Sequence, residues 1–279
     1  MEQEYFAVAF AQMKLTLNYD DVHEFLVENK DYFRQMENII HSLSNKDYDV
    51  LIFPELAYHK KYDKYFLDVS KNKIIVFGST YINSENFTIV YNNRQKFFVK
   101  KMFNSGVEPA VRFQDNISEK EFINRHLKSH TFVLKGKKFI VLNCAEYYKV
   151  AYLIARDKTK SKNLFAFLVP CANNNNQVFL NESMALHNHN EQVHSFIVNS
   201  IGQYKGEKYS NGESYVFGKI SSFEKMCKFA HRLKHSCNIM CLDDGCYLSY
   251  GKYLFKNAST FYRSDNFRHT PKNIEIIKI

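Results

Sequence analysis

Three reactive side chains follow apolar segments that have the length of β-strands. Glu55 comes after DVLIFP, Lys100 closes QKFFV, and Cys144 comes after KFIVLN. Loops just past buried strands are where α/β proteins place reactive groups. Alone, an acid or a lysine at a strand end is usually solvated, and a buried cysteine usually packs as a small hydrophobe. Together, a thiol, a carboxylate and an ammonium supply the nucleophile, the general base and the anion-stabilising charge of covalent catalysis.

The N-terminal part of the chain predicts elements that would position these groups. YFAVAFA is an apolar run of strand length over residues 5–11. Apolar residues then recur at three- and four-residue intervals, which predicts a helix over about 21–43. A second strand over 49–53 stops at Pro54, because proline cannot donate to a β-ladder.

The same alternation of strands and helices continues along the chain. Further helices are predicted near 60–70, 118–128, 147–157, 180–192 and 221–234, and further strands over 74–82, 87–92, 95–102, 130–134, 138–143, 164–170, 195–201 and 214–218. This order predicts an α/β architecture with helices packed outside the sheets. No linker, repeat or shift in composition divides the chain, so we expect a single domain over residues 1–279.

The composition is that of a globular protein. Hydrophobic residues make up 45% and charged residues 24% of the sequence. No stretch approaches the ~18 uncharged apolar residues that span a bilayer, and the first residues lack the basic segment of a signal peptide, so we expect a cytoplasmic protein without membrane association. The six cysteines are expected to be free thiols. The net charge of +9 could attract nucleic acid, but the lysines are scattered, which favours a solvated surface.

Two groups of potential metal ligands are predicted not to bind metal. The groups are His187, His189 and His194, and Cys237, Cys241 and Cys246. Histidines two residues apart do not share a helix face. The cysteines lack the paired C-x-x-C spacing of a structural zinc site.

Four segments carry a recognisable pattern: VAFAQMKL, DVLIFPEL, FFVKKMFNSGVE and FIVLNCAEYY. In these segments the chain resembles the nitrilase, or carbon–nitrogen hydrolase, superfamily, whose opening strand, glutamate motif, lysine motif and nucleophile turn they match in that order. VPCANNNN, NSIG and NGESYVFG resemble later motifs, so the resemblance covers about residues 5–218, and 219–279 match no motif. The resemblance implies an α-β-β-α sandwich, with two mixed β-sheets flanked by helices.

The resemblance also implies roles for the reactive residues. Glu55 would be the general base, Cys144 the nucleophile and Lys100 the cation that stabilises the oxyanion. Lys101 is the competing candidate for the lysine, and it would face the other way if the strand continues. The backbone N–H of Ala145 would be a second oxyanion donor.

Four further residues are candidates for the site. Glu108 stands where many members of the family carry an accessory glutamate, and Glu146 stands in place of their acidic residue two positions after the nucleophile. Both also have ordinary readings, as an exposed loop acid and as an acid at a helix start. Glu146, Cys171 and Asn173 are predicted to line the substrate pocket.

The implied activity is hydrolysis without a cofactor. The substrate would be a small-molecule amide, or less readily a nitrile, cleaved through a thioester on Cys144 by a homo-oligomer, a dimer or larger. The arginine and the proline–glutamate pair that usually follow the cysteine are not clear in YYKVAYLIARD, which leaves the pocket undefined. Two alternatives stay open: an N-acyltransferase with the same triad, and a catalytically silent nitrilase-like protein whose basic surface binds nucleic acid or a protein.

Overall fold

The computed structural model describes most of the chain up to residue 217 and several strands beyond it. The described residues are 6–11, 13–20, 24–26, 30–83, 85–103, 117–173, 176–190, 192–204, 207–211, 214–217, 237–242, 245–250, 253–256, 262–263 and 274–278. The helix predicted over 221–234 and the candidate site residue Glu108 lie outside them.

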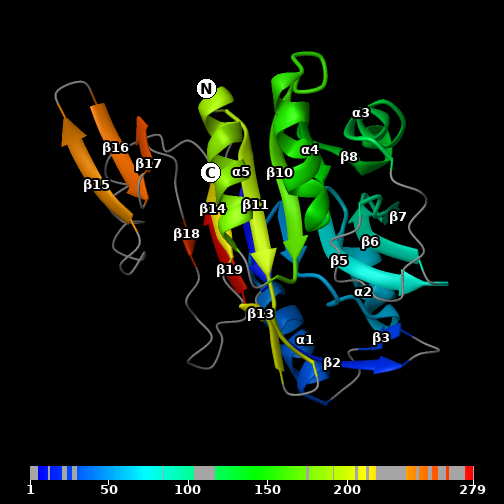
Figure 1. The fold of residues 1–279 in the computed structure, drawn as a ribbon. Coiled ribbons are helices and arrows are strands. Elements are labelled where there is room, and N and C mark those ends of the chain that lie inside the picture. Colours follow the sequence, from blue (N-terminus) through cyan, green and yellow to red (C-terminus); the bar gives the residue numbers. More distant parts are fainter. Residues whose placement is uncertain are drawn as a thin grey trace.

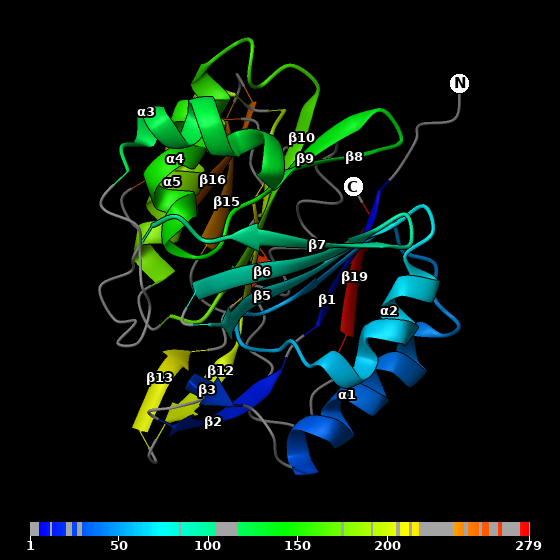
Figure 2. The ribbon, with the colours of Figure 1, turned by 90° about the vertical axis from the view of Figure 1, so that its right-hand side faces the viewer.

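Two six-stranded β-sheets pack face to face between two layers of helices (Figures 1 and 2). The first sheet has the order β19-β1-β4-β5-β6-β7 and consists of Ile274–Lys278, Ala7–Ala11, Val50–Phe53, Ile74–Ile82, Glu85–Asn92 and Gln95–Lys100. The second has the order β18-β14-β11-β10-β9-β8 and consists of Tyr262–Arg263, Tyr215–Phe217, His194–Asn199, Leu164–Cys171, Lys137–Val141 and Thr131–Leu134.

Each sheet has its own layer of helices on its outer face. Helices α1 (Lys30–Leu43) and α2 (Asp63–Val69) pack on the first sheet, and α4 (Ala145–Arg156) and α5 (Asn176–His189) pack on the second. Both sheets are mixed, because a parallel centre (β1, β4 and β5; β9, β10 and β11) is flanked by antiparallel strands. The predicted α-β-β-α sandwich is confirmed.

The alternation of side chains along the strands builds separate cores on the two faces of each sheet. In β1, Val8 and Phe10 pack between the sheets, whereas Ala7, Ala9 and Ala11 pack against the helices. Because successive side chains of a strand point to opposite faces, a strand covered on both faces is apolar throughout. This explains the continuous apolar runs in the sequence, such as VLIF of β4, in which every residue is buried.

Smaller elements complete the structure. A four-stranded sheet, β13-β12-β2-β3, contains Glu207–Asn211, Ile201–Tyr204, Lys14–Asp20 and Glu24–Leu26, and a three-stranded sheet contains β15 (Cys237–Leu242), β16 (Gly245–Tyr250) and β17 (Tyr253–Lys256). The short helices are Lys60–Tyr62 before α2, and α3 (Glu119–Glu121), which continues into a π-helical turn (Phe122–His126) and a 3-10 turn (Leu127–His130).

One predicted helix begins too early. Among the described residues of the periodic pattern over 21–43, Lys30–Leu43 form the helix and Glu24–Leu26 instead form the short strand β3. That strand pairs with β2, which in turn pairs with β12. Because β12 lies far from β2 in the sequence, their pairing cannot be recognised from the local apolar pattern.

The carboxyl ends of the central strands bring the reactive loops to one edge of the sandwich. Glu55 follows β4 and Cys144 follows β9, while Cys171 ends β10. Backbone hydrogen bonds join these ends: the Glu55 N–H donates to the Cys171 carbonyl (3.3 Å), and the Cys144 N–H donates to the Pro170 carbonyl (3.0 Å). The two sheets therefore meet at the place where the reactive residues lie.

Gly78 makes this close approach sterically feasible. It lies where the pairing of β5 with β6 shifts register between Phe77 and Thr80. A Cβ at Gly78 would lie 2.5 Å from the Cβ of Pro170 and 2.8 Å from the Cα of Glu55. Only a glycine leaves room for β10 and for the backbone that carries Glu55.

We predict that Gly78→Ala destabilises the protein by about 1–3 kcal/mol, because the added methyl group overpacks this contact. The measurement is the free energy of unfolding from urea titration. Gly136→Asn is the control, since a Cβ at Gly136 meets nothing within 4 Å and asparagine tolerates its φ of +71°. Equal stability of Gly78→Ala and the wild type would contradict the packing described here.

Candidate active site

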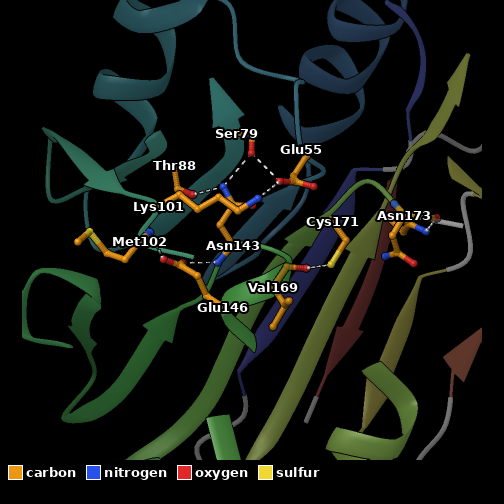
Figure 3. Close-up of polar contacts among 11 residues, drawn as sticks. Glu55, Ser79, Thr88, Lys101, Met102, Asn143, Glu146, Val169, Cys171 and Asn173 are labelled. Atoms are coloured by element: carbon orange, nitrogen blue, oxygen red, sulfur yellow. Dashed lines mark hydrogen bonds and ion pairs between the residues drawn. The ribbon is translucent and has the colours of Figure 1, made fainter. Parts of the chain in front are cut away.

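A buried ion pair joins Glu55 to Lys101. The Lys101 Nζ lies 3.2 Å from the Glu55 Oε1, and the two side chains are 0% and 7% exposed. The backbone N–H of Lys101 donates to the Asn86 carbonyl (2.8 Å), which continues the pairing of β6 with β7 past the end of the strand. Figure 3 shows the Lys101 side chain reaching toward the Glu55 carboxylate.

Lys100 does not reach Glu55, which corrects its predicted placement. Its ammonium pairs with the Glu85 carboxylate on the partly exposed side of the hairpin. Because side chains alternate along a strand, Lys101 shares the buried face of Val99, whereas Lys100 faces the other way. The lysine beside Glu55 is therefore the alternative that the sequence had left open.

Uncharged side chains that are linked by hydrogen bonds hold the Glu55 carboxylate in place. The Ser79 hydroxyl donates to the Glu55 Oε1 (2.5 Å) and accepts from the Asn143 Nδ2 (3.0 Å), which also donates to Thr88 Oγ1 (2.9 Å). Ser79, Thr88 and Asn143 are each about 1% exposed. Ser79 and Lys101 both bind the Oε1 atom of Glu55. The Oε2 atom takes no part in these two contacts, so it is the oxygen that can exchange a proton.

Cys144 occupies a strained turn between β9 and α4. Its φ of 48° and ψ of −104° lie outside the regions that residues with a Cβ favour. Such a conformation costs on the order of 1–3 kcal/mol and is typical of functional sites. The turn is held on both sides, because the Cys144 N–H donates to the Pro170 carbonyl and the Cys144 carbonyl accepts from the Tyr147 N–H (3.0 Å each).

The turn places Cys144 at the start of a long helix. Ala145 is the first residue of α4, and the first N–H groups of a helix have no partner within the helix. In α4 the N–H groups of Glu146 and Tyr147 donate to the Asn143 and Cys144 carbonyls, so the N–H of Ala145, together with the helix dipole, is the one suited to stabilise negative charge next to the Cys144 thiol. The position of the Ala145 N–H is thus compatible with the predicted oxyanion donor.

Glu146 lies behind the site rather than in a pocket. Its carboxylate is 1% exposed and accepts from two backbone N–H groups, those of Met102 (2.7 Å) and Asn143 (2.8 Å). Met102 follows Lys101 and Asn143 precedes Cys144, so one carboxylate ties the lysine segment to the cysteine segment (Figure 3). The predicted contribution to the pocket lining is replaced by a positioning contact.

The imidazole of His130 completes the surroundings of Glu146. Its Nε2 lies 3.6 Å from the Glu146 Oε1, and its Nδ1 lies 2.9 Å from the His126 carbonyl. A carbonyl only accepts, so the Nδ1 carries a proton.

Cys171 lies next to Cys144 inside the core. Its side chain is completely buried. Burial, followed by the neighbouring Cys144 and by the negative charge of Glu55, raises the pKa of Cys171 well above its usual range, although the Lys101 ammonium opposes this. Cys171 is therefore a neutral thiol at physiological pH.

Solved structures of carbon–nitrogen hydrolases have the same architecture. One is a carbon–nitrogen hydrolase superfamily protein from Xanthomonas campestris with an arsenic adduct in its active site; 77% of this chain aligns with 83% of that chain at 11% identity and a TM-score of 0.52. A Saccharomyces cerevisiae member of the nitrilase superfamily aligns over 77% and 82% of the two chains at 15% identity (TM-score 0.50). An amidase from Nesterenkonia sp. AN1 aligns over 76% and 82% at 11% identity (TM-score 0.51).

The chain has the carbon–nitrogen hydrolase fold. At these identities the likeness concerns the fold alone. No protein-family model matches the sequence, and no curated protein matches it significantly.

Asn173 begins the loop that follows β10 of the carbon–nitrogen hydrolase fold. Its backbone is held by Asn199, whose side chain accepts from the Asn173 N–H and donates to the Asn173 carbonyl (3.0 Å each). The Asn173 side-chain amide is buried, and both of its polar atoms lack a hydrogen bond among the described residues. An amide of this kind retains a donor and an acceptor for a bound molecule, in keeping with its predicted place in the pocket.

Several residues of the site carried no signal in the sequence. Ser79, Asn143, Thr88 and His130 are common residue types without motif spacing, and they meet only through the pairing of distant strands. The sequence did indicate Lys101, because it stands two positions after the apolar Val99 and so lies on the same face of the strand. No cluster of three or more potential metal ligands occurs within the described part of this fold, and none of its described helices is long and apolar enough to cross a membrane.

We predict that Lys101→Met lowers the free energy of unfolding by about 3–5 kcal/mol, because it leaves the buried Glu55 carboxylate without its cation. Lys100→Met is the matched control, and we expect it to cost at most about 1 kcal/mol, since its ion pair is partly solvated. Urea titration of both variants measures the difference.

The Glu55→Gln/Lys101→Met double variant measures how much of this loss comes from the charge left unpaired. It should recover part of the loss, because it removes the unpaired charge. Equal destabilisation by the two lysine variants would contradict the assignment of Lys101 as the partner of Glu55.

Proposed function

We propose that this protein is a cofactor-independent hydrolase that cleaves the carbon–nitrogen bond of a small-molecule amide through a thioester on Cys144. Glu55 acts as the general base and Lys101 as the cation that stabilises the oxyanion. The observation that carries the proposal is the buried Glu55–Lys101 pair, held at the edge of the sandwich where Cys144 occupies a strained turn at a helix start. The carbon–nitrogen hydrolase fold supports the reaction class.

The first half-reaction forms the thioester. Glu55 takes the proton of the Cys144 thiol, and the sulfur attacks the amide carbon. Negative charge develops on the former carbonyl oxygen, where the Lys101 ammonium and the Ala145 N–H stabilise it. The tetrahedral intermediate collapses, the carbon–nitrogen bond breaks, and Glu55 returns the proton to the departing ammonia or amine.

The second half-reaction releases the acid. Glu55 takes a proton from a water molecule, which attacks the thioester carbon; the carbon–sulfur bond breaks, the Cys144 sulfur takes the proton from Glu55, and the carboxylic acid is released. An acyltransferase would differ only here, because an amine or an alcohol would replace water. The Asn173 amide is buried, and its donor and acceptor are unused by the described residues, which supports a substrate that carries a polar group.

The test measures ammonia release from a panel of short aliphatic amides, including acetamide, propionamide, succinamate and glutamine. We expect Cys144→Ala to abolish release, and Lys101→Met to lower kcat by about 10²–10³-fold because it removes one oxyanion donor. Lys100→Met should retain nearly wild-type rates. Circular dichroism confirms that each variant is folded.

Three outcomes distinguish this proposal from its alternatives. Ammonia release that survives in Cys144→Ala would overturn the thioester mechanism. Release that requires added hydroxylamine, with an acyl hydroxamate as the product, would identify an acyltransferase. Absence of both reactions, with salt-dependent binding of single-stranded DNA or RNA, would identify a binding protein that uses its basic surface.

A further inference from the structure

Two buried thiols face each other across neighbouring strands at the centre of the site. β9 and β10 are parallel, and Val141 is opposite Leu168. The hydrogen bonds from the Leu142 N–H to the Leu168 carbonyl and from the Cys144 N–H to the Pro170 carbonyl carry this register forward. Cys144 therefore stands directly opposite Cys171.

The geometry of the strands brings the two residues within the range of a disulfide. Neighbouring strands lie about 4.7–4.9 Å apart, and disulfides join residues whose Cα atoms are about 4.4–6.8 Å apart. The two side chains are close enough that Cys144 contributes to the raised pKa of the Cys171 thiol. Both cysteines are free in the structure and belong to the same apolar cluster.

The surroundings explain why the pair would react in a fixed order. Cys144 is 6% exposed and begins α4, whereas Cys171 is completely buried. Cys171 therefore meets an oxidant only through Cys144. The Cys171 Sγ also lies 3.6 Å from the Val169 carbonyl, a weak contact that a small rotation of the side chain would give up (Figure 3).

We propose that Cys144 and Cys171 form an oxidisable dithiol, in which Cys171 resolves the oxidised nucleophile as a reversible disulfide. A peroxide oxidises the Cys144 thiol to a sulfenic acid and is itself reduced to water or an alcohol. The Cys171 sulfur then attacks the Cys144 sulfur, the new S–S bond replaces the S–O bond, and the hydroxyl leaves as water with the proton of the Cys171 thiol. Thiol reductants restore both cysteines.

This pairing would protect the nucleophile. Without a resolving thiol, a sulfenic acid proceeds under excess peroxide to sulfinic and sulfonic acids, which reductants do not reverse. The proposal rests on the placement of the two thiols and not on the hydrolysis of an amide.

The experiment treats the native protein with hydrogen peroxide, removes the peroxide, unfolds the protein in urea with N-ethylmaleimide to block free thiols, and maps the peptides by mass spectrometry without reduction. Trypsin places Cys144 in residues 139–149 and Cys171 in residues 163–205, and neither peptide contains another cysteine. We expect these two peptides to be joined with the loss of two hydrogens. Dithiothreitol should separate them and restore both thiols.

Cys171→Ser is the matched control, because it keeps the shape of the side chain and removes the resolving sulfur. In this variant we expect peroxide to convert Cys144 to sulfinic acid, which dithiothreitol does not reverse. Wild-type protein in which Cys144 becomes sulfinic acid while Cys171 still reacts with N-ethylmaleimide would overturn the proposal. A disulfide from Cys144 to any cysteine other than Cys171 would do the same. The experiment measures peptide masses, so its result does not depend on whether an amide substrate is found.

Discussion

The site depends on one buried ion pair. A carboxylate and an ammonium removed from water are costly unless they are paired and their remaining hydrogen-bonding capacity is used. Glu55 and Lys101 meet these conditions, because Ser79 donates to the carboxylate and the surrounding side chains are buried. The pair therefore requires that β4, β5 and the end of β7 keep fixed positions relative to one another. The same arrangement places a carboxylate and an ammonium at the edge of the sandwich that carries Cys144.

Cys144 is attached to this pair by two contacts through neighbouring residues. Asn143 uses its side chain to bind Ser79 and its N–H to bind Glu146, which also holds the N–H of Met102. The segments of Lys101 and Cys144 thus share the Glu146 carboxylate, and the Ser79 hydroxyl links the Glu55 carboxylate to Asn143, the residue before Cys144. Hydrogen bonds of this kind offset the backbone strain at Cys144, which would otherwise relax. The arrangement holds the reactive groups before any substrate arrives, as electrostatic catalysis requires.

The sequence predicts what depends on local pattern and not what depends on distant pairing. The strand over 74–82 and the positions of Glu55 and Cys144 after apolar strands were predicted, because burial on both faces leaves a continuous apolar run. The early start of the helix over 21–43 was wrong, because β3 owes its existence to a sheet that includes β12. Lys100 was preferred to Lys101 on the family resemblance; Phe98, which shares the face of Lys100 on β7, is large and apolar but 52% exposed, so the sequence did not show that this face is the solvated one. Glu146 was expected in the pocket because its spacing cannot show that its carboxylate turns back to the backbone.

The most direct test of the account is the alkylation rate of each cysteine by iodoacetamide in the native protein at pH 7, measured by peptide mass spectrometry. The account predicts that Cys144 reacts ahead of the other five thiols. It also predicts that Glu55→Gln and Lys101→Met each slow Cys144 by at least about tenfold, because both change the charges that activate the sulfur, while Lys100→Met leaves the rate unchanged. A Cys144 that reacts no faster than Cys171, or at the same rate in all three variants, would contradict the claim that this buried pair serves an activated nucleophile.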